Sequence, residues 1–293
     1  MSLSLSIGGG KQGASSGTGS RPDGSSPSVS PLTGFDPLRK LSVLDLFSGI
    51  GGFSLGLERT GGFETVAFCE IEHFPRKILA KHWPDVPIYE DVRTLTAERL
   101  AADGIGVDVI CGGFPCQDIS SAGEQAGIDG DRSGLWSEIV RLSRELRPRY
   151  VLVENVADLL SGDCGRWFGR VLGDLAEIGF DAQWDCIPAS YVGAGHPRDR
   201  VWIVAHPASF GRGEVHFDVE APEALAPGQP TGTGPKVGWQ WEPEPNVVRV
   251  VHGLPKRMDR IKSLGNAVVP QIPELIGRAI LAAEAIPHLE AAK

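Results

Sequence analysis

Short apolar runs alternate with segments of helical periodicity between residues 41 and 207. The runs have strand length and contain β-branched residues, whereas the segments between them repeat apolar side chains every three or four positions. We predict strands at 43–47, 65–69, 86–89, 107–111, 150–154, 183–187 and 201–205. We predict helices at 53–59, 75–81, 97–102, 135–146 and 167–178. This alternation favours an α/β fold with an open, mostly parallel sheet and helices on both faces.

The flanking segments do not follow this rhythm. Residues 1–38 consist mainly of Gly, Ser, Thr and Pro, so we expect a disordered tail that cannot bury enough apolar surface to offset the entropy of ordering. Residues 208–256 are rich in Pro, Gly and acidic side chains and are expected to form a loop-rich insertion. Residues 257–286 begin with basic side chains and end in an apolar helix from about Gln271 to Ala285.

Composition narrows the class of protein. The 293 residues are 41% hydrophobic and 22% charged, with no apolar run of the roughly 18 residues that a membrane helix needs. The first residues lack the apolar core of a signal peptide, so we expect a cytoplasmic protein with no membrane partner. The five cysteines form no CxxC pair and no zinc pattern, which predicts reduced thiols and no metal. A net charge of −9 argues against binding nucleic acid by bulk electrostatics.

A glycine-rich turn follows the first predicted strand, in the stretch from Asp45 to Phe53. In open α/β sheets such a turn lets the backbone approach a ligand, although a tight turn requires glycine in any case. Glu70 and Asp91 follow the second and third strands, where an acid can bind ribose hydroxyls. Each could instead be a capping or surface acid. Their register with three successive strand ends favours a ligand site.

Three further groups follow later strands. Cys116 leaves the fourth strand through two glycines and a proline, so it is either a reactive thiol at the ligand edge or an inert buried one. Glu154 ends the fifth strand, where an acid is costly unless it is paired, functional or capping a helix. Arg198 and Arg200 precede the last strand and suit a phosphate or base oxygen, unless they lie on a solvated edge strand.

The order of these groups closely resembles that of the C5-cytosine DNA methyltransferases of bacterial and phage type. The resemblance rests on DLFSGIGGFSLGLE (45–58), GGFPCQDIS (112–120), VENV (153–156), RDR (198–200) and GNAVVPQ (265–271). It implies a Rossmann-like fold that uses S-adenosylmethionine. It also implies that residues 41–207 form the catalytic and cofactor-binding domain, that 208–256 are a short target-recognition segment, and that 257–286 return to the catalytic domain.

By the same resemblance, the chain is a DNA (cytosine-5-)-methyltransferase that forms a covalent cysteine adduct. Cys116 would add to carbon 6 of a flipped-out cytosine, Glu154 would protonate N3, and Arg200 would donate to O2. Arg198 completes the expected catalytic set. The cofactor would contact eleven residues: Phe47, Gly49, Ile50, Gly52, Glu70, Ile71, Asp91, Pro115, Leu135, Asn266 and Val268.

The sequence departs from the family pattern twice. His196 stands where the family more usually has Gln, and the recognition segment is shorter than usual. Two alternatives follow: an RNA (tRNA) cytosine methyltransferase, against which the Phe114-Pro115-Cys116 sequence argues, and a non-catalytic DNA-binding remnant. The partners implied are DNA and a cognate restriction endonuclease, and we expect a monomer. Basic groups that could meet DNA phosphates are Arg198, Lys256, Arg257, Arg260 and Lys262.

Overall fold

A computed structural model of the chain describes residues 39–115, 133–210 and 257–285. The strands described are β1 (Leu41–Leu46), β2 (Phe63–Cys69), β3 (Ile88–Tyr89), β4 (Val109–Gly112), β5 (Tyr150–Val156), β6 (Phe180–Cys186) and β7 (Arg200–Pro207). The α-helices are α1 (Gly52–Arg59), α2 (His73–His82), α3 (Ala97–Ala102), α4 (Trp136–Leu146), α5 (Arg166–Glu177), α6 (Arg257–Asn266) and α7 (Gln271–Ala285). None of the described helices is both long and apolar enough to cross a bilayer.

The strands form one sheet in the order β3-β2-β1-β4-β5-β7-β6. The five strands from β3 to β5 are parallel, whereas β7 runs antiparallel to both β5 and β6. The predicted α/β fold with a mostly parallel sheet is therefore confirmed. The alternative that the arginines lie on a solvated edge strand is wrong, because β7 is enclosed between two strands and is buried along most of its length.

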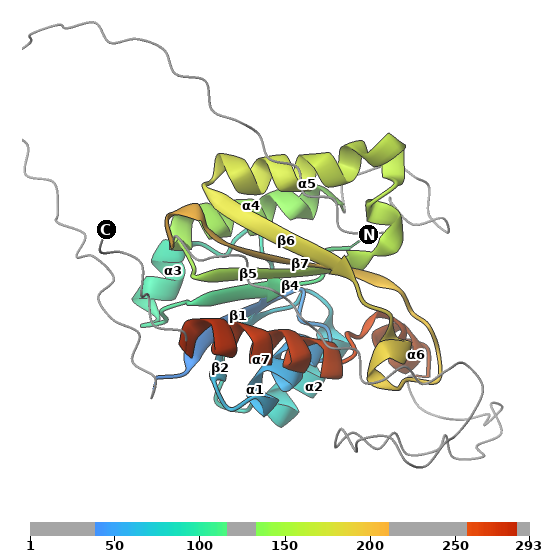
Figure 1. Ribbon diagram of the computed structural model, residues 1–293. Coiled ribbons are helices and arrows are strands. Elements are labelled where there is room, and N and C mark those ends of the chain that lie inside the picture. The colour runs from blue at the N-terminus through green and yellow to red at the C-terminus, as the bar shows by residue number, and fades with distance from the viewer. Residues whose placement is uncertain (1–38, 116–132, 211–256, 286–293) are drawn as a thin grey trace, which may run out of the picture. The chain divides into compact units, whose positions relative to one another are not determined.

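Helices cover both faces of the sheet (Figure 1). On one face, Ile110 of β4 belongs to a core cluster that includes Trp136 of α4 and Val171 of α5. On the other, Val43 of β1 clusters with apolar residues of α1 and with Ile276 of α7. The end of α7 is also tied to β5, because the Tyr150 hydroxyl donates to Oε1 of the buried Glu284 at 2.7 Å. Residues more than 200 positions apart therefore share one core.

The packing of α1 against the start of α7 requires a glycine at position 56. A Cβ built there would lie 2.1 Å from the carbonyl oxygen of Pro270 and 2.9 Å from the Cβ of Pro273. Backbone atoms cannot yield as a flexible side chain can. The two elements can approach this closely only because Gly56 has no side chain.

We expect Gly56→Ala to lower the free energy of unfolding by about 1–3 kcal/mol, because overpacking outweighs the gain of up to about 1 kcal/mol in helix propensity. Gly173→Ala is the matched control, since Gly173 lies within α5 with no atom within 4 Å of its added Cβ. The control should keep or raise the stability. Urea unfolding of both variants measures the difference, and equal stabilities would contradict the packing argument.

Candidate active site

A cavity of about 500 Å³ opens at the carboxyl ends of the parallel strands. Phe47, Glu70 and Asp91 line it after β1, β2 and β3, while Gly113 and Glu154 reach it from β4 and β5. Its volume is within the range of small-molecule sites. The candidate functional residues at the ends of these five strands therefore line the same cavity.

The glycine-rich turn is fixed by Glu70. The Gly49 amide donates to Glu70 Oε2 at 2.7 Å, and the Glu72 amide donates to Oε1 at the same distance. Gly49 has a φ of 53° and Gly51 a φ of 86°, which glycine adopts without steric cost. Burial is the main reason that the pKa of Glu70 is raised, and the two amide hydrogen bonds act against it. The carboxylate is thus held in place with lone pairs left for a ligand.

Asp45 is a second buried acid, lying beneath the turn and unassigned by the sequence analysis. Its Oδ2 accepts from the Ser54 hydroxyl at 2.7 Å, at the start of α1. Burial raises the pKa of Asp45 to about 7, although the hydrogen bonds from Ser54 lower it and the nearby Glu70 raises it further. Below about pH 7 the folded protein therefore keeps this carboxyl mostly protonated, whereas the unfolded chain ionises it near pH 4.

A raised pKa makes the contribution of Asp45 to stability depend on pH. The contribution is fully present below the unfolded pKa near 4 and is lost as pH rises through the folded value of about 7. The three-unit difference corresponds to about 4 kcal/mol between pH 4 and pH 8. The Asp45→Asn side chain cannot ionise. The difference in free energy of unfolding between this variant and the wild type should therefore shift in favour of the variant by about 4 kcal/mol as the pH rises from 4 to 8. Denaturant titrations across the range test this, and parallel pH curves would contradict it.

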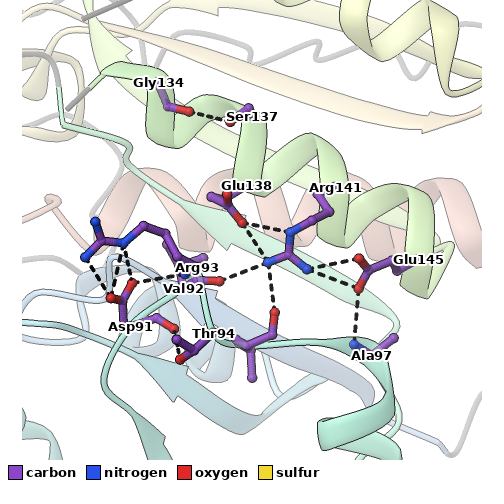
Figure 2. Close-up of polar contacts among 11 residues, drawn as sticks. Asp91, Val92, Arg93, Thr94, Ala97, Gly134, Ser137, Glu138, Arg141 and Glu145 are labelled. Atoms are coloured by element: carbon purple, nitrogen blue, oxygen red, sulfur yellow. Dashed lines mark hydrogen bonds and ion pairs between the residues drawn. The ribbon is translucent and has the colours of Figure 1, made fainter. Parts of the chain in front are cut away.

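Asp91 is presented to the cavity by a segment that α4 holds in place (Figure 2). Arg141 of α4 donates to the carbonyl oxygens of Val92 at 2.9 Å and Leu95 at 2.8 Å. Arg93 binds the Asp91 carboxylate with Nε at 2.9 Å from Oδ1 and Nη2 at 2.7 Å from Oδ2. These hydrogen bonds lower the pKa of Asp91. Asp91 is therefore an ionised acceptor on the cavity wall.

Glu154 and Arg200 form an ion pair at the opposite end of the strand row. Arg200 Nε lies 2.9 Å from Glu154 Oε1. The antiparallel pairing of β5 and β7 places Arg200 opposite Val156, and Glu154 lies two residues before Val156, so its side chain is on the same face of the sheet. Burial raises the pKa of Glu154, while Arg200 and Arg198 lower it. Glu154 is paired with Arg200, and Val156, the N-cap of the short helix that follows β5, makes no side-chain capping hydrogen bond. A largely buried acid with a raised pKa beside a fixed cation is suited to proton transfer.

Two neighbours shape this end of the site, and the sequence analysis gave neither a role. A Cβ at Gly113 would lie 2.9 Å from Glu154 Oε2, so glycine leaves room for the carboxyl. Asn155 is buried and donates from Nδ2 to the Phe114 carbonyl at 3.2 Å. The Phe114 ring packs on Trp136 with centroids 5.5 Å apart. The backbone that leads to position 116 is thereby anchored at Phe114.

The sequence model of the C-5 cytosine-specific DNA methylases matches residues 41–229. That stretch is more than half of the chain and contains the turn, both acids and the Glu154–Arg200 pair. The chain belongs to the C-5 cytosine-specific DNA methylase family. It is 35% identical over 169 residues to the type II methyltransferase M2.BsuMI of Bacillus subtilis, covering 56% of this chain and 42% of that protein.

Two other comparisons agree with this family. The type II methyltransferase M.NgoMIV of Neisseria gonorrhoeae is 36% identical over 167 residues, which are 57% of this chain and 52% of that one. A solved structure described as a prophage-encoded DNA modification methyltransferase of E. coli is similar with a TM-score of 0.50 and 29% identity, covering 58% of this chain and 48% of that chain. The chain spans about half the length of the curated relatives it matches.

Most of the expected methylase site residues meet at the cavity. Its described lining includes Phe47, Gly49, Glu70, Ile71, Asp91, Pro115, Leu135, Asn266, Glu154, Arg198 and Arg200. Ile50, Gly52 and Val268 are not among the described residues that line it. Gly52 contacts Val268 instead, since a Cβ at Gly52 would lie 2.6 Å from the Val268 carbonyl oxygen. Cys116 lies outside the described residues, as does most of the 208–256 segment.

The basic groups suggested for DNA phosphates have partners within the protein where they are described. Arg198 donates to the carbonyls of Gly265 and Ala267, and Lys262 pairs with Glu72 at 2.9 Å. Lys256 and the side chains of Arg257 and Arg260 lie outside the described part of the chain. Contact of these groups with phosphates stays a prediction.

Proposed function

We propose that the protein transfers a methyl group from S-adenosylmethionine to carbon 5 of a flipped-out cytosine in DNA, through a covalent adduct of Cys116. The observation that carries the proposal is the Glu154–Arg200 pair, fixed at one end of a cavity whose other end holds Glu70 and Asp91. Family membership supports the reaction class. We further propose a monomer in which residues 41–207 and 257–286 form the catalytic unit and 208–256 the recognition segment.

The cavity residues suit S-adenosylmethionine. Glu70 is a buried carboxylate whose orientation is set by two amides, which suits hydrogen bonds from vicinal ribose hydroxyls. Asp91 is ionised and can accept from an exocyclic amino group. Ile71 is 61% exposed yet lines the cavity, so its apolar side chain offers a surface for a planar base. When bound, this cofactor supplies an electrophilic methyl group.

The catalytic residues would make carbon 5 nucleophilic. The Cys116 thiolate would add to carbon 6, and the pair of electrons displaced from the 5,6 double bond would make carbon 5 the attacking atom. Glu154 would donate a proton to N3 as negative charge develops, and its raised pKa favours the acid form that this step needs. Arg200 would hold Glu154 through Nε and donate to O2 of the base. Once carbon 5 has accepted the methyl group, loss of its proton to solvent would re-form the 5,6 double bond and expel the Cys116 thiolate, and N3 would return its proton to Glu154.

Parallel transfer assays test this proposal. Purified full-length protein is incubated with labelled S-adenosylmethionine and either mixed-sequence plasmid DNA or tRNA. We expect label in the DNA, on cytosine carbon 5 after nucleoside analysis, and none in the tRNA. Label confined to tRNA would contradict the proposal and identify an RNA cytosine methyltransferase. The absence of label from both substrates would also contradict it and support a non-catalytic member of the family.

A further inference from the structure

Arg198 ties its own segment to a second one, whose residues Gly265 and Ala267 lie 67 and 69 positions further along the chain. Its Nη1 donates to the Gly265 carbonyl at 2.7 Å and its Nη2 to the Ala267 carbonyl at 2.9 Å. Between these two carbonyls stands Asn266, which lines the cavity. The guanidinium therefore holds both residues that flank a cavity-lining side chain, in the forked geometry that only arginine provides.

The segment that carries Arg198 is itself firmly held. The Ala189 amide donates to the Pro197 carbonyl at 2.6 Å, and Arg198 has a φ of 39°, which a non-glycine residue adopts only where its surroundings impose it. Two residues further on, Arg200 pairs with Glu154. The Arg198 guanidinium is therefore separated from the Glu154–Arg200 pair by only two residues of backbone, and the backbone of Arg198 itself is constrained.

The 265–270 segment is confined on its other side by α1. The Val268 carbonyl oxygen would lie 2.6 Å from a Cβ at Gly52, and the Pro270 carbonyl oxygen 2.1 Å from one at Gly56. Helix α1 thus confines the segment at 268 and 270, while Arg198 holds the carbonyls on both sides of Asn266. The geometry thus provides one mechanical link between the two ends of the cavity.

We propose that Arg198 is a positioning residue that couples the base-binding end of the cavity to its cofactor-binding end. The inference rests on the proposed function and deepens it. A cytosine held by Glu154 and Arg200 would fix the 198–200 segment, and Arg198 would then fix Asn266 against the cofactor. Each ligand would raise the affinity of the other by the same factor, as linkage requires.

The test measures the affinity for S-adenosylhomocysteine, which cannot donate a methyl group, by calorimetry with and without mixed-sequence plasmid DNA. For the wild type we expect DNA to tighten binding by about fivefold or more. Arg198→Gln should reduce this ratio toward one, and Arg198→Lys, which can donate to one carbonyl at a time, should give an intermediate ratio. Arg144→Gln is the matched control, because Arg144 is an exposed arginine of α4 whose partner is the exposed Glu177.

Two results would overturn the proposal: a wild-type ratio of one, or a wild-type ratio retained in Arg198→Gln. A purely structural role would lower the melting temperature and weaken both affinities by the same factor, leaving the ratio unchanged. If Arg198→Gln does not fold, Arg198→Lys decides by the same ratio. Failure of the proposed function is a separate outcome, namely coupled binding by a wild-type protein that transfers no label to DNA.

Discussion

Cys116→Ser is expected to abolish methyl transfer, with a loss of at least about three orders of magnitude, while S-adenosylmethionine binds with nearly wild-type affinity. A serine hydroxyl lacks the accessible anion and the intrinsic nucleophilicity of a thiol, and removal of a covalent nucleophile costs several orders of magnitude. In the described part of the chain, the residue before it, Pro115, lines the cavity. Single-turnover transfer of labelled methyl groups measures the rate, and calorimetry measures cofactor binding.

Cys164→Ser is the control for this experiment, because Cys164 is a free, exposed cysteine that is absent from the described cavity lining. DNA that contains 5-fluorocytosine provides a second readout. With no removable proton at carbon 5, the base should trap an adduct with the wild type and with Cys164→Ser but none with Cys116→Ser. Transfer by Cys116→Ser within about tenfold of the wild-type rate would refute the nucleophile assignment.

Glu154→Gln should lower the rate of methyl transfer by about two to four orders of magnitude, with a much smaller loss of DNA affinity. The amide has nearly the shape of the acid and can still contact the base. It cannot supply a proton at N3 as negative charge develops, so the loss falls on the transition state. Arg200 loses its carboxylate partner, which lies 2.9 Å away, so the melting temperature is measured alongside.

The matched control is Glu177→Gln, which changes an exposed acid on α5. Rates come from rapid-quench single turnovers at saturating cofactor, and DNA affinities from fluorescence anisotropy. If rate and affinity fall by the same factor, Glu154 only docks the base and the proton-donor role is wrong.

The parts of the site that are local in sequence could be predicted. A strand followed by glycines and a helix has a local pattern, and the acids at 70 and 91 were expected at the cavity because they follow consecutive parallel strands. The helices at 97–102 and 271–285 were predicted with the boundaries that the structure has. In each case the pattern that allowed the prediction lies within a single helix or strand and the few residues that follow it.

The parts that depend on distant pairing could not be predicted. Nothing in the residues of β7 states that it runs antiparallel between β5 and β6, since strand order is set by interactions across the whole sheet. The contact of Arg198 with the carbonyls of 265 and 267 involves backbone atoms that every residue has. Helix α6 is mostly polar, with only Met258, Ile261 and Leu264 as large apolar residues, and the sequence analysis noted only its basic character. The raised pKa of Asp45 arises from burial, which a single acid in an apolar run does not reveal.

The sharing of one core by β1 and α7 has a consequence for synthesis on the ribosome. Val43 and Leu57 are buried together with Ile276, yet more than 200 residues must be added between them. At about 5–20 residues per second, that takes roughly 10–45 seconds. During this interval the apolar surface of β1 and α1 that α7 covers lacks its final partner, and exposed apolar surface of this kind is what chaperones shield. Asn266, which lines the cavity, is also among the residues made late, so a nascent chain lacks this part of the cavity wall until then.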